Sequence, residues 1–274
     1  MLLGIFHHQK QYNTRKIICQ HTEPSPVFVT QEKLFVNTQN RPLCSLIKEL
    51  SSLGSFSGVD KNGNDVYNGD VKKERIAHIV IGLPAAGKSS VLVNPLSESY
   101  AARVVDCDMA KAMLPEYDGG IGANAVHLES KDISDEVLKN SLQNGENIVY
   151  PIVGASYNKL LGTIASIKDK GYTVYLHLNE LPNGKAIGRA LMRYFQTGRF
   201  ISPDLIKECG NKPTAVFEKI IQTEGLIDGY TRFSNDVEKG KEPIRRAKRG
   251  NIKEFDGRIS KLGSGNTGDG SLCG

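Results

Sequence analysis

The feature that most constrains this chain is a glycine-rich segment that directly follows a short apolar run. The segment reads GLPAAGKSS over residues 82–90, and the apolar run before it reads IAHIVI over residues 76–81. The pattern G-x-x-x-x-G-K-[ST] between a strand and a helix is typical of a loop that holds nucleotide phosphates. Glycine lets consecutive amide N–H groups turn toward an anion, and the following helix presents its positive end. The segment therefore predicts a phosphate-binding loop.

The residue types in this loop indicate its ligands. Lys88 is expected to reach the outer phosphates, and the hydroxyl of Ser89 is expected to ligate Mg²⁺. We therefore predict ATP or GTP, together with Mg²⁺, as cofactors. The residues expected to bind the nucleotide are Gly82, Ala85, Ala86, Gly87, Lys88, Ser89 and Ser90.

Apolar segments alternate with helical patterns between residues 73 and 238. This alternation is typical of a parallel sheet with helices on both faces. We therefore predict an α/β fold of the phosphate-loop NTPase class, in which helices sandwich a parallel sheet. Strands are expected at 76–81, 103–105, 147–153 and 172–178, and helices after the loop and at 109–114, 134–143, 157–170 and 183–196.

Two weaker units flank this predicted domain. Residues 1–72 are expected to form a small, partly ordered extension, with short strands at 27–30 and 34–36 and a helical turn from Ser45. Asn62 and Gly63 indicate a hairpin turn, because both residues tolerate positive φ. Residues 239–274 begin charged and end rich in glycine and serine, so we expect a mobile tail.

Charge and composition exclude several classes of protein. The net charge is +5, and it falls to +1 without the basic run of Arg245, Arg246, Lys248 and Arg249. The remainder gives no strong nucleic-acid signal. We expect the run to be part of a solvated tail, with an anionic partner as the alternative. The opening MLLGIF is too short for a signal sequence, and no apolar run suits a membrane span. We therefore expect a cytoplasmic protein, and the five scattered cysteines indicate neither disulfides nor a zinc site.

Two carboxylates follow the second predicted strand, in RVVDCD. Parallel strands deliver their carboxyl ends to the ligand crevice, so Asp106 and Asp108 are candidates for chemistry. We favour Asp108 as a general base and Asp106 as a metal-binding residue. The alternative is that one of the two caps the following helix.

The third predicted strand lacks an acidic residue at its end. Tyr150, Pro151 and Ile152 stand where a motor ATPase usually has a carboxylate that holds the metal and polarises water. This difference weakens the interpretation as an NTP-hydrolysing motor or a GTP switch. Because Pro151 has no N–H donor, the strand is expected to end or bulge there.

Arginines follow in and after the predicted helix 183–196. Its apolar face comprises Ala186, Ile187, Ala190, Leu191 and Tyr194, which leaves Arg189 and Arg193 on the opposite side. Arginines that close over the γ-phosphate stabilise phosphoryl transfer, and Arg193 and Arg199 are placed as a lid requires. The alternative is a solvated helix face with an incidental loop arginine.

A polar group, AVHLESKDIS, precedes the predicted helix 134–143. His127 and Glu129, together with Arg189, are candidates for substrate contact. A structural role for His127 is the alternative. Ser130 or Ser134 is expected to cap the helix.

The loop GLPAAGKSS, the motif VVDCD and the later MRYFQTGRFISPD together resemble the zeta-toxin family of phosphate-loop kinases, over about residues 73–237. The resemblance implies an adenylate-kinase-like core and ATP-dependent phosphorylation of a small molecule, in known members a uridine-diphosphate amino sugar. It also implies that Lys88 binds phosphate, Ser89 the metal, and Asp108 acts as base. Arg193 and Arg199 match the two arginines that clamp the transferred group.

One departure concerns the acceptor. Where family members have a Glu-Gly-Thr stretch that contacts the sugar, this chain has Pro151, Ile152 and Val153. The amino-sugar nucleotide is therefore only one candidate. The resemblance also implies an antitoxin, or an inhibitory segment within residues 1–72, that covers the nucleotide site.

The function predicted from the sequence is a Mg²⁺-dependent kinase that transfers the γ-phosphate to a hydroxyl of a small molecule. One alternative is a polynucleotide 5′-hydroxyl kinase, which uses the same loop, acid and arginines. Another is a non-catalytic nucleotide-binding module that controls a partner protein.

Overall fold

The computed structural model describes residues 42–253 except 121, 124, 239 and 240, so the strands expected at 27–30 and 34–36 and the end of the chain lie outside it. The strands are β1 (Ser55–Val59), β2 (Asp65–Gly69), β3 (Ile76–Ile81), β4 (Arg103–Val104), β5 (Ile148–Pro151), β6 (Thr173–Glu180), β7 (Gly229–Ser234) and β8 (Ile244–Arg249). The helices are α1 (Leu43–Ser52), the π-helical η1 (Ser89–Val93), α2 (Asn94–Tyr100), α3 (Cys107–Ala112), the 3₁₀-helical η2 (Pro115–Gly120), α4 (His127–Asn144), α5 (Tyr157–Lys168), α6 (Asn183–Thr197), α7 (Pro203–Cys209) and α8 (Lys212–Ile221).

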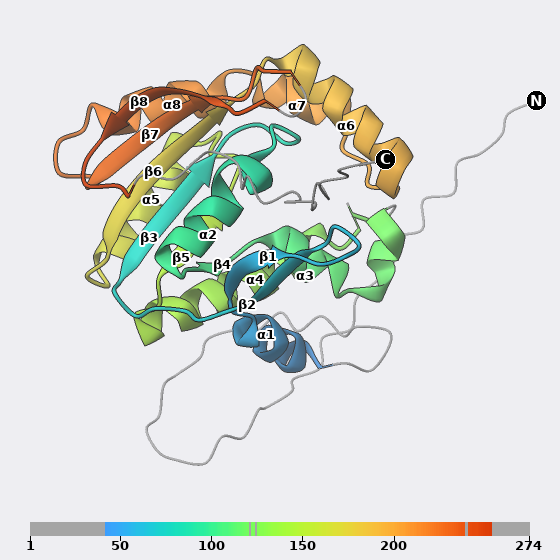
Figure 1. Ribbon diagram of the computed structural model, residues 1–274, viewed down its shortest axis with the longest axis horizontal. Coiled ribbons are helices and arrows are strands. Elements are labelled where there is room, and N and C mark those ends of the chain that lie inside the picture. The colour runs from blue at the N-terminus through green and yellow to red at the C-terminus, as the bar shows by residue number, and fades with distance from the viewer. Residues whose placement is uncertain (1–41, 121, 124, 239–240, 254–274) are drawn as a thin grey trace, which may run out of the picture.

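The described strands form one sheet in the order β2-β1-β4-β5-β3-β6-β7-β8 (Figure 1). The five inner strands, from β4 to β7, run parallel. At the edges, β1 pairs antiparallel with β4, β2 with β1, and β8 with β7. The predicted α/β class is therefore confirmed. Because β3 lies in the middle, the glycine-rich loop that follows it emerges at the centre of the carboxyl edge.

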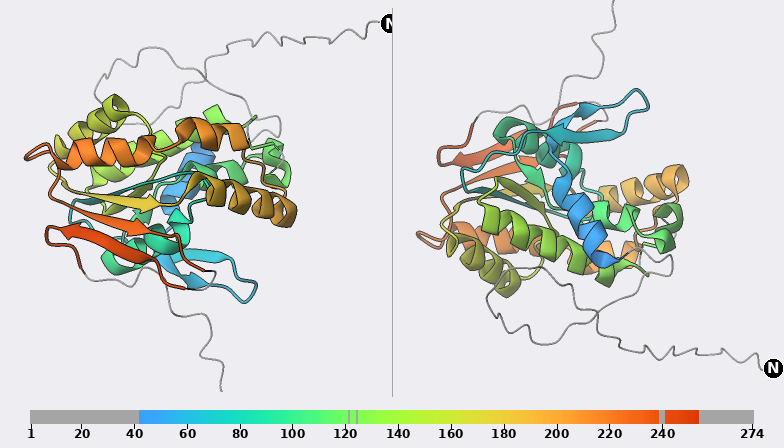
Figure 2. Two further views of the ribbon diagram at one scale, coloured as in Figure 1. Left: turned by 90° about the horizontal axis from the view of Figure 1, so that it is seen from above. Right: turned by 90° about the horizontal axis from the view of Figure 1, so that it is seen from below.

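Helices cover both faces of the sheet. In the left view of Figure 2, the orange α8 and the green α4 lie on one side of the strands and the teal α2 on the other. Alternate residues of β3 serve the two faces, because successive side chains of a strand point in opposite directions. Ile79 and Ile81 join the core beneath α1, α4, α5 and α8, whereas Val80 packs with Leu92 and Leu96 near α2. No helix within the described ranges is both long and apolar enough to cross a membrane.

The described part of the N-terminal extension is joined to this sheet. Leu46 and Leu50 of α1 are buried in the main core. The predicted hairpin is confirmed: β1 and β2 pair through a turn in which Gly63 has φ +82° and the Asp60 carboxylate accepts from the Asn62 and Asn64 N–H groups. Strand β1 then meets β4 at Ser55 and Arg103.

The basic run 245–249 is not part of a tail, contrary to the sequence-based expectation. It forms β8, which pairs with β7 from Tyr230 and Arg249 to Ser234 and Ile244. Hydrophobic alternation is weak here because β8 is an edge strand, where charged side chains remain in water and discourage pairing with other chains. The expectation failed because β8 forms through backbone pairing with β7, and the pattern of polar residues does not reveal such pairing.

Two helix predictions also need correction. Helix α4 begins at His127 rather than Ser134, and Ser130, expected to cap it, lies inside it and donates its hydroxyl hydrogen bond to the His127 carbonyl. In α6, Ala186 and Ala190 are buried but Leu191 and Tyr194 are exposed. The helix packs near its start and then extends away from the sheet, at the upper right of Figure 1.

A chain of polar side chains crosses the centre of the sheet. His78 of β3 and His177 of β6 share a hydrogen bond of 2.9 Å, and His177 Nδ1 lies 2.7 Å from the Thr231 hydroxyl on β7. Burial lowers the pKa of His177 to about 3, and burial and the neighbouring His177 lower the pKa of His78 well below its usual value. Both rings are therefore neutral in the folded protein.

This histidine pair predicts loss of stability in mild acid. The unfolded chain takes up a proton at each histidine as the pH falls below about 6.5, while the folded protein does not, so stability is lost from about pH 6.5 downward. Between about pH 6.5 and 5 the loss should be about 2 kcal/mol for each histidine. Urea-induced unfolding at several pH values measures it. The glutamine of His177→Gln cannot titrate, so the loss of unfolding free energy between about pH 6.5 and 5 should be about 2 kcal/mol smaller in this variant than in the wild type. An equal loss in both proteins would contradict this account.

Candidate active site

At two positions in the loop between β3 and η1, the backbone adopts a conformation that only glycine accommodates. Gly82 has φ +152°, and a Cβ there would lie 2.4 Å from the Asn179 carbonyl oxygen. Gly87 has φ +85°, and its Cβ would lie 2.6 Å from Asn235 Nδ2. Real Cβ atoms do not approach so closely without displacing their neighbours. The loop is therefore packed tightly against the ends of β6 and β7.

Lys88 lies across this loop. Its ammonium group donates to the Gly82 carbonyl at 2.9 Å and to the Leu83 carbonyl at 3.0 Å. Burial lowers the pKa of Lys88 to about 8, although the nearby Asp106 and Asp108 oppose the shift. Ser89 is exposed at the start of η1, and the Ser90 hydroxyl donates to the Gly87 carbonyl at 3.3 Å.

Asp106 is the residue that caps a helix. It precedes α3 in an extended conformation, and its carboxylate accepts from the Asp108 N–H at 2.9 Å. Burial and the adjacent Asp108 raise the pKa of Asp106 to about 6. Of the two alternatives left open by the sequence, capping thus applies to Asp106 and leaves the Asp108 side chain free for other contacts.

Asp108 lies in the first turn of α3 between two cations. Its Oδ1 accepts from Lys111 Nζ at 3.2 Å, and its Oδ2 accepts from Arg199 Nη2. Burial alone would raise the pKa of Asp108, but Arg199 and Lys111 outweigh burial and hold it below the usual value. The sequence analysis missed Lys111, although its position three residues after Asp108 on a helix places both on one face.

The three predicted arginines occupy different places. Arg199 lies in the α6–α7 loop, with its backbone so close to Gly120 of η2 that a Cβ on that glycine would lie 2.7 Å from the Arg199 Cα. The guanidinium group of Arg189 in α6 lies beside the phosphate loop instead, and its Nη2 donates to the Asn235 carbonyl at 3.0 Å. Arg193, one turn beyond Arg189, is half-buried.

His127 and Glu129 lie in the first turn of α4. His127 is exposed, and partial burial and Lys111 lower its pKa, with Asp108 opposing them. Glu129 Oε1 is buried and has no hydrogen-bond partner among the described residues. Burial, Glu116 and Asp132 raise the pKa of Glu129. Lys111 and Asp108 thus both act on the charge of His127, which places it near the Asp108 side of the site.

The donor atoms suit a hard divalent cation. One ligand atom each of Asp106, Cys107 and Asp108 lies within 4.8 Å of the others. Burial and the two carboxylates raise the pKa of the Cys107 thiol to about 12, so it stays protonated and is a poor ligand. The remaining donors, together with the Ser89 hydroxyl, are oxygens, which Mg²⁺ prefers. The residues therefore fit Mg²⁺.

Two buried asparagines that the sequence analysis did not select also touch the loop. Asn179 of β6 and Asn235, directly after β7, both donate to the Ala86 carbonyl. A signal for them exists, since a polar residue at the carboxyl end of a buried parallel strand lies at the ligand crevice.

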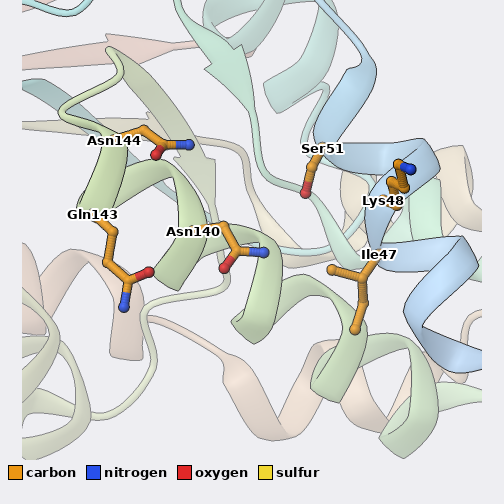
Figure 3. Close-up of a pocket in the computed structure, with 6 residues that line it drawn as sticks. All are labelled: Ile47, Lys48, Ser51, Asn140, Gln143 and Asn144. Carbon is orange, nitrogen blue, oxygen red and sulfur yellow. The ribbon is translucent and has the colours of Figure 1, made fainter. Parts of the chain in front are cut away.

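Neither of two cavities in the described part of the chain is lined by Lys88, Asp108 or Arg199. A cavity of about 240 Å³ has Gly82 and Leu83 in its wall, but lies mostly between the end of β6 and the start of α8. A larger cavity, of about 330 Å³, lies between α1 and α4 and is lined by Ile47, Lys48, Ser51, Asn140, Gln143 and Asn144 (Figure 3). The larger cavity has no carboxylate or other evident base among its lining residues.

Comparison with known proteins gives the same fold. The zeta toxin family model matches residues 64–237. The solved structure of the PezAT toxin–antitoxin system of Streptococcus pneumoniae is 16% identical, with a TM-score of 0.55 over 75% of this chain and 79% of that chain. The AvrRxo1-ORF1:AvrRxo1-ORF2 complex with ATP is 15% identical, with a TM-score of 0.55 over 75% of this chain and 65% of that chain. No curated protein matches significantly. Because the family model covers more than half of the sequence, the chain belongs to the zeta toxin family.

Proposed function

We propose that this protein is a kinase that transfers the γ-phosphate of ATP, or of GTP, to a hydroxyl group of a small molecule in the presence of Mg²⁺. The observation that carries the proposal is the meeting of Lys88, Asp108 and Arg199, three groups from separate parts of the chain. Arg199 and Asp108 form an ion pair, and both lie near enough to Lys88 to act on its pKa, which Asp108 raises and Arg199 lowers. A phosphate-binding cation, an ionised base and an arginine that can reach the γ-phosphate are recurring parts of phosphoryl-transfer sites.

In the proposed reaction, the amides of the loop and Lys88 bind the β- and γ-phosphates. Ser89 and Asp106 would hold Mg²⁺, which neutralises phosphate charge when bound. The acceptor hydroxyl oxygen forms a bond to the γ-phosphorus while the bond from that phosphorus to the β,γ-bridging oxygen breaks. The hydroxyl proton passes to a carboxylate oxygen of Asp108, and the nucleoside diphosphate leaves.

Arg199 and Arg193 are proposed to stabilise the charge on the transferred group. Arg199 is bonded to Asp108 Oδ2, so on nucleotide binding its guanidinium group would move to the γ-phosphate oxygens and free that carboxylate oxygen. Lys111 would keep its contact with Oδ1. Arg189, which contacts the Asn235 carbonyl, is better placed to support the phosphate loop than to bind an acceptor.

The end of β5 bears on the choice of acceptor. Strand β5 ends at Pro151, and Ile152 and Val153 follow it, so an apolar segment stands where family members have a sugar-binding stretch. A uridine-diphosphate amino sugar is therefore one candidate acceptor, with His127 and Glu129 as candidate contacts. The likeness to toxin–antitoxin complexes supports an antitoxin as a partner.

Replacing the proposed base tests the chemistry directly. Asp108→Asn should lower the rate of phosphoryl transfer by about 10²–10⁴-fold, because the hydroxyl proton loses its acceptor. Nucleotide affinity should change little. The measurement is the gain of one phosphate mass in a metabolite extract, or in oligonucleotides, incubated with protein, ATP and Mg²⁺. The exposed Asp169→Asn is the matched control. Transfer by Asp108→Asn at the wild-type rate would refute this assignment.

Arg199 should matter for transfer more than for nucleotide binding. Arg199→Ala should reduce kcat by about 10³–10⁵-fold, because the charge on the transferred group loses its stabilisation. Arg199→Lys should retain part of the activity, since it keeps the charge but loses the planar guanidinium group. The exposed Arg246→Ala on β8 serves as control. Equal losses in both arginine-to-alanine variants would argue against a role in the lid.

A further inference from the structure

We infer that Asn179 and Asn235 are positioning residues of the phosphate loop: they hold the Ala86 carbonyl so that the Gly87 amide faces the phosphate. The inference rests on the proposed nucleotide binding, but not on the identity of the acceptor. It gives a role to two side chains that lie at the ends of neighbouring strands and would not touch the reacting atoms.

The contacts converge on one atom. The Ala86 carbonyl oxygen accepts from Asn179 Nδ2 at 2.9 Å and from Asn235 Nδ2 at 2.8 Å, and Arg189 Nη1 makes a longer contact with the same oxygen at 3.5 Å. Asn179 is 0% exposed and Asn235 is 3% exposed. The two short bonds come from buried amides and match the two lone pairs of the oxygen, so the ends of β6 and β7 set the direction of this carbonyl.

Because a peptide group is planar, the direction of the Ala86 carbonyl also sets the direction of the Gly87 N–H. In a planar trans peptide, the C=O of one residue and the N–H of the next point in opposite directions. When the Ala86 carbonyl points back toward β6 and β7, the Gly87 N–H must therefore point away from them, toward the mouth of the loop. This orientation also keeps the Ala86 carbonyl oxygen, which would repel an anion, away from the mouth of the loop.

The two asparagines are themselves held in place. The Asn235 N–H donates to the Glu180 carbonyl at 2.9 Å, which ties the residue after β7 to the end of β6. Arg189 Nη2 donates to the Asn235 carbonyl at 3.0 Å. A Cβ on Gly87 would lie 2.6 Å from Asn235 Nδ2, so the Asn235 amide packs closely against the loop at this residue.

One further observation argues against a purely structural role. Asn179 Oδ1 is buried without a hydrogen-bond partner among the described residues. An unpaired buried acceptor lowers stability, so a core selected only for stability would favour an apolar residue here. An asparagine at position 179 is explained if the phosphate loop needs its side-chain N–H donor.

The test measures binding of MgADP to the full chain, which needs no acceptor. Asn179→Ala and Asn235→Ala should each weaken MgADP binding by about tenfold in calorimetric titration, as expected for one lost buried hydrogen bond, and the double variant should weaken it further. Asn235→Asp keeps the side-chain shape but removes the amide donor, and should weaken binding at least as much as Asn235→Ala. Asn140→Ala, in the α1–α4 cavity, is the matched control and should bind normally.

A second measurement separates positioning from packing. In the wild-type protein, the amide ¹⁵N–¹H resonance of Gly87 should shift when MgADP is added. In Asn179→Ala, this shift should shrink while the melting temperature stays close to that of the wild type. MgADP binding and Gly87 shifts equal to wild type in both variants would overturn the inference alone. Failure of the wild-type protein to bind MgADP would overturn the proposed function as well.

Discussion

The site depends on the direction of a few peptide groups at the centre of the carboxyl edge of the sheet. Gly82 and Gly87 permit a tight loop, and the ends of β6 and β7 support it from below. This arrangement requires β3 to lie beside β6, and β6 beside β7, in parallel. The long-range strand order is therefore what places Lys88 and the loop amides where an anion can bind.

The opposite edge of the site is organised by charge. Asp106 and Asp108 are separated only by Cys107, yet burial raises the pKa of Asp106, while Arg199 and Lys111 overcome burial and lower the pKa of Asp108. Neighbouring carboxyl groups whose environments move their pKa values apart are suited to different roles. Here helix capping fixes Asp106, and Asp108 is held as a carboxylate by Arg199 of the α6–α7 loop and by Lys111.

Local patterns in the sequence predicted the features that local chemistry determines. The glycine-rich loop, the apolar strand before it, the Asn62–Gly63 hairpin and the end of β5 at Pro151 all follow from residues close in sequence. Strand β8 was missed because an edge strand made of arginine and lysine has no apolar alternation. Asn179 and Asn235 were missed because they acquire their partner, Ala86, only through the order of the strands. The ion pair of Arg199 and Asp108 joins residues far apart in sequence in the same way.

The most direct test of this account is an experimental structure of the protein with Mg²⁺ and a non-hydrolysable ATP analogue. The account predicts a triphosphate in contact with the Gly87 amide and Lys88, with the Arg199 guanidinium moved from Asp108 to the γ-phosphate and a carboxylate oxygen of Asp108 facing the terminal phosphorus. A nucleotide bound elsewhere, or an Asp108 carboxyl group directed away from the phosphorus, would contradict it.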